Sequence, residues 1–162
     1  MKKILTALFF YSLSIGAFAI TNVGDVPFDD LGKDINGNVV HISDYQGKVV
    51  IVTFWATWCH YCMQEIPVLE NIQKQAGTSK LQVIAVSHGE TMPMFKKVCK
   101  ALPDIQSILS FDKGNSAKKY DVKGIPHMII IGKNGKVSAQ HIGYSEKELP
   151  SLVAEINQLL RE

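Results

Sequence analysis

The feature that most constrains the fold is a pair of largely apolar runs, residues 49–54 (VVIVTF) and 81–87 (LQVIAVS). The first run consists almost entirely of β-branched residues, which favour strands. A run that is apolar on both faces is typical of a central parallel strand covered by helices. We therefore predict an α/β fold with a mixed central sheet and helices on both faces.

Helical periodicity and turn signals surround these two strands. We predict helices over residues 59–77, over 92–102 with Pro103 as its end, over about 115–120, and from Ser145 onward, where Ser145 and Glu148 form a capping box. The last helix should bury Leu149, Leu152, Val153, Ile156, Leu159 and Leu160. Asn-Gly turns predict an N-terminal β-hairpin over about residues 35–42 and a second hairpin joining strands 128–131 and 137–142.

The N-terminus has the three parts of a secretory signal peptide. Lys2 and Lys3 are followed by an apolar run over residues 4–15 and by Ala17-Phe18-Ala19. We predict a signal peptide over residues 1–19 and one domain over residues 20–162, located in the periplasm. The alternative is an uncleaved membrane anchor, because no charge occurs between Ile4 and Gly24.

Composition excludes several classes of protein. Hydrophobic residues make up 46% and charged residues 20% of the chain, as in a soluble globular protein rather than a disordered or multi-span membrane chain. The 17 basic and 15 acidic residues balance too evenly for an electrostatic nucleic-acid binder. Three cysteines are too few for a disulfide scaffold, so a hydrophobic core must stabilise the domain.

Two of those cysteines, Cys59 and Cys62, lie where the first central strand ends and a helix begins. Unpaired N–H groups at a helix start favour negative charge, so Cys59 should be the attacking thiolate. Cys62, one turn further, should be shielded and able to close a disulfide with Cys59. The main alternative is half a zinc site, but the sequence has no second pair of ligands to complete it. A second alternative is an inert structural disulfide. We predict no metal.

A larger set of residues surrounds this pair. It comprises residues 54–62 (FWATWCHYC), Glu65, Pro67, Gly124-Ile125-Pro126, and residues 44–48 (DYQGK) before the first central strand. Together these resemble the thioredoxin superfamily, and within it the exported TlpA/ResA-like thiol:disulfide oxidoreductases, over nearly the whole of residues 20–162. The resemblance implies a thioredoxin fold, a redox-active Cys59–Cys62 disulfide that needs no organic cofactor, and a cis Pro126 beside it.

Glu65 and Pro126 are the first supporting candidates. Glu65 shares a helix side with both cysteines and could relay protons to Cys62, as the TlpA/ResA-like resemblance also suggests, whereas the alternative is a solvated glutamate. Thr53 stands where many thioredoxins carry a buried aspartate. If Pro126 is cis rather than an ordinary trans proline, the backbone of Ile125 offers a short edge for strand addition by a client.

The residues around the motif supply further expectations. Trp58 could cover the active face and Trp55 should pack, and core burial is the preferred interpretation for both. His60 and Tyr61 replace the Gly-Pro or Glu-Pro common in related proteins, and both changes favour the reduced form. We therefore predict a reduction potential above thioredoxin's value of about −270 mV.

Two other residues are expected to be structural. Cys99 should be a buried, inert thiol on the apolar face of the second helix. His127 follows Pro126 and could lie near the sulfurs, although a structural role is the preferred interpretation.

The function implied is exchange of disulfides with protein thiol and disulfide clients, without nucleic acid. The resemblance favours reduction of protein disulfides, for example in cytochrome c maturation, with electrons from a membrane-bound redox partner. A disulfide oxidase or isomerase is the alternative that the His60-Tyr61 pair favours. A binding module or metal chaperone that uses the fold only as a scaffold is a further one.

Overall fold

The computed structural model describes residues 21–102 and 104–162. The predicted signal peptide or anchor, as well as Pro103, lies outside the described residues. In the described part of the chain the strands are β1 (Asp30–Lys33), β2 (Val39–His41), β3 (Val49–Trp55), β4 (Leu81–Ser87), β5 (Ile108–Phe111), β6 (His127–Ile131) and β7 (Val137–Ile142). The helices are α1 (His60–Ala76), α2 (Met92–Ala101), α3 (Asn115–Lys119) and α4 (Leu149–Arg161), with 3-10 turns at Ile42–Tyr45 and Glu146–Glu148. None of these helices is both long and apolar enough to cross a membrane.

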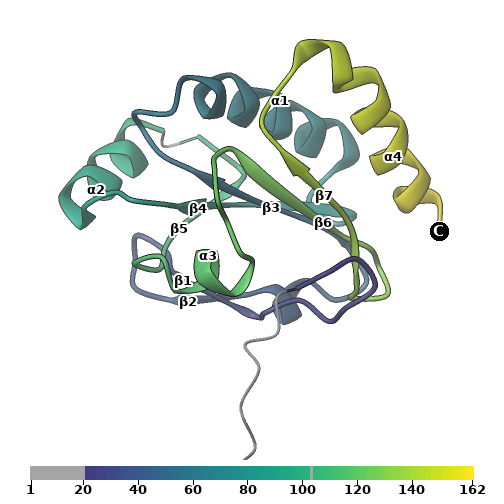
Figure 1. The fold of residues 1–162 in the computed structure, drawn as a ribbon, viewed down its shortest axis with the longest axis horizontal. Coiled ribbons are helices and arrows are strands. Elements are labelled where there is room, and N and C mark those ends of the chain that lie inside the picture. The colour runs from purple at the N-terminus through teal and green to yellow at the C-terminus, as the bar shows by residue number, and fades with distance from the viewer. Residues whose placement is uncertain (1–20, 103) are drawn as a thin grey trace, which may run out of the picture.

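The strands form one mixed sheet in the order β2-β1-β5-β4-β3-β6-β7 (Figure 1). At its centre β3 and β4 run parallel, from Val49 opposite Leu81 to Trp55 opposite Ser87, and every residue of both strands is buried. On its other side β3 pairs antiparallel with β6. The prediction of central strands buried on both faces is confirmed.

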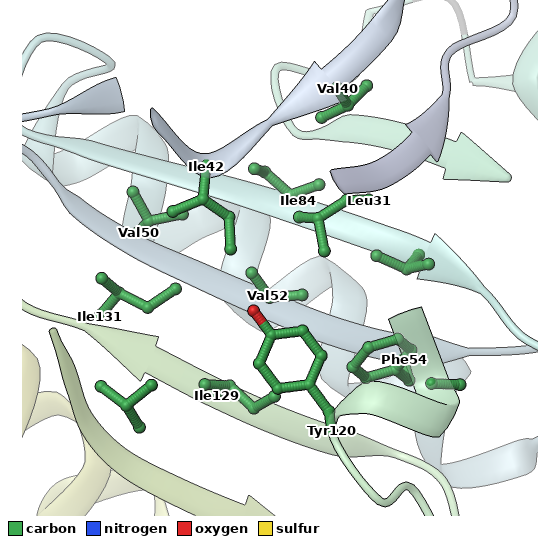
Figure 2. Close-up of a cluster of buried hydrophobic side chains, with 13 residues drawn as sticks. Leu31, Val40, Ile42, Val50, Val52, Phe54, Ile84, Tyr120, Ile129 and Ile131 are labelled. Atoms are coloured by element: carbon green, nitrogen blue, oxygen red, sulfur yellow. The ribbon is translucent and has the colours of Figure 1, made fainter. Parts of the chain in front are cut away.

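Alternation along β3 separates two layers of core. Val49 and Ile51 pack toward α1 and α4 with Leu69 and Ile156. On the opposite face, Figure 2 shows the cluster around Tyr120, which closes α3. Its labelled members are Leu31, Val40, Ile42, Val50, Val52, Phe54, Ile84, Tyr120, Ile129 and Ile131. Helices thus cover both faces of the sheet, as predicted.

Strand β5 was absent from the sequence prediction. It pairs in parallel with β4 and antiparallel with β1, so it joins the N-terminal hairpin to the central sheet. The segment before it is held by the Glu70 carboxylate, which accepts hydrogen bonds from the Gln106 and Ser107 N–H groups at 2.9 Å. A four-residue strand has little periodicity of its own, and here its position depends on partners distant in sequence.

Local sequence signals also predicted the boundaries of two elements incorrectly. The N-terminal hairpin forms, but its first strand ends at Lys33, because Asp34 accepts hydrogen bonds from the Asn36 and Asn38 N–H groups and makes residues 34–38 a turn. The predicted capping box is wrong. The Ser145 side chain makes no capping hydrogen bond, and a 3-10 turn over Glu146–Glu148 precedes α4.

The buried faces of two helices are narrower than predicted. On α2, Phe95 is 1% exposed, whereas Met92 at the start of the helix is 37% exposed. On α4, Leu152, Ile156 and Leu159 are buried as expected, but Val153 is exposed. The predicted burial is therefore confirmed for residues at the centre of each helix's apolar face and wrong for residues at its edges.

Candidate redox-active site

The two motif cysteines form a disulfide at the start of α1. Cys59 is the N-cap residue, Cys62 lies in the first turn, and their Cα atoms are 5.3 Å apart. The Cys62 N–H donates a hydrogen bond to Cys59 Sγ at 3.2 Å. Cys62 is fully buried and Cys59 is 6% exposed. The predicted pairing and the shielding of Cys62 are confirmed, and Cys59 is also largely covered in this oxidised form.

The two tryptophans beside the motif separate clearly. Trp55, the last residue of β3, is 1% exposed and packs in the cluster that contains both cysteines. Trp58 is 66% exposed, and its ring lies against Gly89 in the loop after β4. Core packing of Trp55 is confirmed, whereas the preferred prediction that Trp58 is buried in the core is wrong. Trp58 instead presents an aromatic surface immediately before Cys59.

His60 and Tyr61 lie on the exposed side of the first turn of α1. Their rings meet edge to face with centroids 5.6 Å apart, and Tyr61 is 57% exposed. The Nε2 atom of His60 is 3.4 Å from the Gln64 side-chain nitrogen one turn along. Both side chains therefore stand at the solvent surface between the cysteines, and their effect on the reduction potential stays a prediction.

Glu65 lies on the buried side of α1, and its side chain is turned to the sheet. It is 1% exposed, and the Thr53 hydroxyl donates a hydrogen bond of 2.6 Å to its Oε2 atom. Burial raises the pKa of Glu65 to about 7, although the hydrogen bond from Thr53 opposes this increase. The alternative of a solvated glutamate is therefore wrong. Glu65 also lines a pocket of about 230 Å³ next to His141 and Tyr144.

The Ile125–Pro126 peptide bond is cis, as predicted. Pro126 is buried, and its carbonyl accepts a hydrogen bond of 2.8 Å from the Gly143 N–H. Ile125 is partly buried and packs against the cluster that contains Cys59 and Cys62. The fold therefore brings a corner more than sixty residues further along the chain to the disulfide.

His127 and Cys99 have structural surroundings. His127 is 3% exposed, meets the Phe54 ring edge on, and has Nε2 3.4 Å from Gln140 Oε1. Burial lowers the pKa of His127. Cys99 is only partly buried, unlike the prediction, because it lies at the margin of the Phe95 face of α2. Burial raises the pKa of its thiol.

Sequence reasoning missed Glu90, which belongs to the loop between β4 and α2. One oxygen of its carboxylate accepts a hydrogen bond of 2.6 Å from the Thr57 N–H and a second bond from the Thr57 hydroxyl. Thr57 lies two residues before Cys59 in the motif. A single acidic residue in a loop carries no local pattern that would have revealed this contact. Within the described residues, no cluster of three or more His, Cys, Asp and Glu could hold a metal ion.

Comparison with known proteins agrees with this geometry. Residues 22–160 match the Redoxin family. The chain is 32% identical to Thioredoxin-like protein YneN of Bacillus subtilis over 72% of its own length and 69% of the relative. It is 31% identical to the Thiol-disulfide oxidoreductase ResA of the same species over 75% of its length and 68% of ResA. The chain thus spans about two thirds of each relative.

Solved structures of similar proteins also support a thiol-disulfide oxidoreductase with this fold. A Chlorobium tepidum protein assigned as thiol:disulfide interchange protein DsbE superposes with a TM-score of 0.76 at 31% identity, covering 86% of this chain and 99% of that one. A Bacteroides thetaiotaomicron protein assigned as a protein disulfide isomerase also has a TM-score of 0.76, at 28% identity, covering 88% of this chain and 92% of that one. The chain belongs to the Redoxin family and, within the thioredoxin superfamily, to the TlpA/ResA-like thiol:disulfide oxidoreductases.

Proposed function

We propose that this protein reduces disulfides in client proteins outside the cytoplasm, with Cys59 as nucleophile and Cys62 as resolving thiol. The Cys59 thiolate attacks one sulfur of the client disulfide and releases the other as a thiolate. Cys62 then attacks Cys59 Sγ, frees the second client sulfur and forms the Cys59–Cys62 disulfide. The client gains two electrons, the protein loses two, and no organic cofactor takes part.

The observation that carries this assignment of roles is the hydrogen bond from the Cys62 N–H to Cys59 Sγ, 3.2 Å long, at the start of α1. In the reduced protein the same N–H and the helix N-terminus would stabilise a thiolate at Cys59. Cys62 is fully buried, whereas Cys59 keeps 6% exposure, so Cys59 Sγ is the sulfur that a client can reach first. The arrangement supports one attacking and one resolving sulfur.

Glu65 is suited to accept the proton that Cys62 must lose before it attacks. It lies one turn beyond Cys62 on the same helix, and its pKa near 7 allows both protonation states at neutral pH. A solvated carboxylate would stay ionised and would bind a proton only weakly. The Thr53 hydroxyl of β3 donates a hydrogen bond to this carboxylate and holds it in place.

The client would bind next to the disulfide along the Ile125–Pro126 corner. The backbone of Ile125 would offer a short edge for strand addition, and the exposed Trp58 ring, next to Cys59 in the sequence, would offer apolar contact. Main-chain pairing of this kind accepts many sequences. It therefore supports broad recognition of extended protein segments.

Different observations support the proposed location of the protein and the proposed direction of electron transfer. Residues 1–19 have the pattern of a signal peptide, which supports export of a domain over residues 20–162 to the periplasm. The TlpA/ResA-like resemblance is our ground for inferring reduction of client proteins, and we propose cytochrome c maturation as the process and a membrane-bound redox partner as the electron source. The His60-Tyr61 pair and the likeness to the Bacteroides thetaiotaomicron protein favour the second candidate, a disulfide oxidase or isomerase.

One trapping experiment tests roles and direction together. Cells that produce Cys62→Ser should accumulate mixed disulfides at Cys59, and mass spectrometry of these adducts identifies the clients. Cys59→Ser is the matched control and should trap none. With purified wild-type protein and dithiothreitol, insulin should be reduced faster than in blanks. Equal trapping by the two variants, or insulin reduction no faster than in the blank, would refute the proposal.

A further inference from the structure

The loop that delivers Cys59 to the start of α1 is tied to the loop that follows β4. The His88 N–H donates a hydrogen bond of 2.7 Å to the Trp55 carbonyl, and the Trp58 ring lies against Gly89. Between these two contacts, the Thr57 N–H and hydroxyl both donate to Glu90 Oε1. Residues 88–90 therefore hold the segment before the nucleophile at three points.

Glu90 supplies the only side-chain acceptor among these ties. A further backbone hydrogen bond, from the Cys59 N–H to the Ala56 carbonyl at 3.1 Å, joins two residues of this same loop and therefore does not position the loop against the sheet. A carboxylate that accepts two hydrogen bonds binds its donors about twice as strongly as a neutral acceptor. The two partners are 33 positions apart in sequence, so the contact fixes the loop relative to the core.

We propose that Glu90 is a positioning residue for the redox reaction. It holds Thr57 so that Cys59 stays at the N-cap of α1, with Sγ directed at the Cys62 N–H. This inference rests on the proposed role of Cys59 as nucleophile. Without Glu90, the loop would gain freedom and the Cys59 thiolate would lose part of the helix-start stabilisation that makes it reactive.

The direction in which the pKa of Cys59 changes when Glu90 is removed distinguishes a positioning role from a direct effect of the negative charge. If Glu90 acts by positioning, its removal raises the pKa of the Cys59 thiol, because the thiolate loses a donor. If it acted through its negative charge, removal would lower that pKa, because a nearby anion disfavours a thiolate. Glu90→Gln divides the two cases, since the amide oxygen keeps the acceptor and loses the charge.

The test is the pH profile of Cys59 alkylation by iodoacetamide in the reduced full chain, read site by site by mass spectrometry. Glu90→Ala should react about tenfold more slowly than wild type at pH 6, while Glu90→Gln stays within about twofold. The ionisable side chains of His60, Glu65 and His88 are present in every variant, so their effects cancel in the comparison. The reduction potential, measured against glutathione, should become more reducing in Glu90→Ala only.

Glu70→Ala is the matched control. Glu70 is another carboxylate that anchors a loop, through the Gln106 and Ser107 N–H groups and the Ser107 hydroxyl. Its loss should lower the unfolding midpoint without moving the Cys59 profile. Thr57→Val removes the hydroxyl donor at nearly constant shape, and it should show part of the Glu90→Ala shift even if that variant folds poorly.

Three results would overturn the inference: an unchanged Cys59 profile in Glu90→Ala, a fall in the Cys59 pKa in Glu90→Ala and Glu90→Gln alike, or an equal rise in Glu70→Ala. These failures differ from failure of the proposed function. Insulin reduction that survives Cys59→Ser would reject Cys59 as the nucleophile. Normal reduction by Glu90→Ala together with none by Cys59→Ser would reject only the role of Glu90.

Discussion

Replacing Glu65 by Gln should stabilise the oxidised protein at alkaline pH and have a much smaller effect in acid. The Glu65 carboxyl is 1% exposed, and burial raises its pKa from 4.5 to about 7. In the unfolded chain the same carboxyl ionises near its ordinary value. As the pH rises from about 4.5 to 7, the unfolded state therefore loses the Glu65 proton while the folded state keeps it, and folding becomes less favourable.

The size of the effect follows from those two pKa values. Each pH unit between them is worth about 1.4 kcal/mol, so the full difference is about 3 kcal/mol. This contribution is present below about pH 4.5 and is lost as the pH rises through about 7. Glu65→Gln cannot ionise, and its amide oxygen can still accept the hydrogen bond from Thr53. The variant should therefore gain about 3 kcal/mol on wild type between pH 4.5 and 8.5.

The assay is urea unfolding of the oxidised proteins at several pH values, because disulfide-bonded Cys59 and Cys62 do not titrate. Other ionisable groups cancel in the difference between wild type and variant. Glu70→Gln is the control with the opposite sign. Burial raises the pKa of Glu70, but hydrogen bonds from Ser107 and Gln106 outweigh it and hold the pKa below its ordinary value. Its contribution is lost as the pH falls, so Glu70→Gln should lose most at neutral pH and least in acid.

A difference between wild type and Glu65→Gln that stays constant within about 0.5 kcal/mol from pH 4.5 to 8.5 would refute the reasoning. Such a result would mean that Glu65 ionises as easily in the folded protein as in the unfolded chain. Its proposed role as proton acceptor for Cys62 would then lose its physical basis.

Three further predictions test the fold. Gly32→Ala should cost about 3 kcal/mol in urea unfolding, because φ is +84° and a Cβ would lie 2.4 Å from a backbone oxygen of β5; Gly37→Ala, at +88° with open space, should cost only about 1 kcal/mol. Tyr120→Phe should cost about 1 to 2 kcal/mol in the same assay, since the Phe28 carbonyl loses its 2.7 Å hydrogen bond. His127 should titrate below pH 6.5 by NMR, because burial disfavours the imidazolium; its contribution to stability is present above pH 6.5 and is lost as the pH falls from there through its lowered folded pKa, and an NMR value at or above 6.5 would contradict its buried environment.

Much of the site could be predicted from local pattern. The buried central strand and the helix that begins at the cysteine pair depend on short segments whose residue types favour one conformation, whereas the cis Pro126 was implied by the family resemblance. The order of these segments, strand then cysteines then helix, is enough to predict that Cys59 lies at a helix N-terminus. The functional class followed from those residues together with their resemblance to a known family.

Other features depend on contacts between distant positions. Whether Glu65 was solvated or buried could not be decided from helix periodicity, because its burial depends on Thr53 in β3, 12 positions away. The link between Thr57 and Glu90 spans 33 positions, and β5 forms only between β4 and β1.

The difference between the features that the sequence predicts and those that only the structure reveals has a physical cause. Backbone propensity and hydrophobic period act over a few neighbouring residues, so the sequence alone determined the principal strands and helices and the place of the two sulfurs. The protonation of a carboxyl and the orientation of a loop depend on which atoms surround them after folding. Only the tertiary structure therefore decided that Glu65 has a pKa near 7 and that Glu90 binds the loop before Cys59.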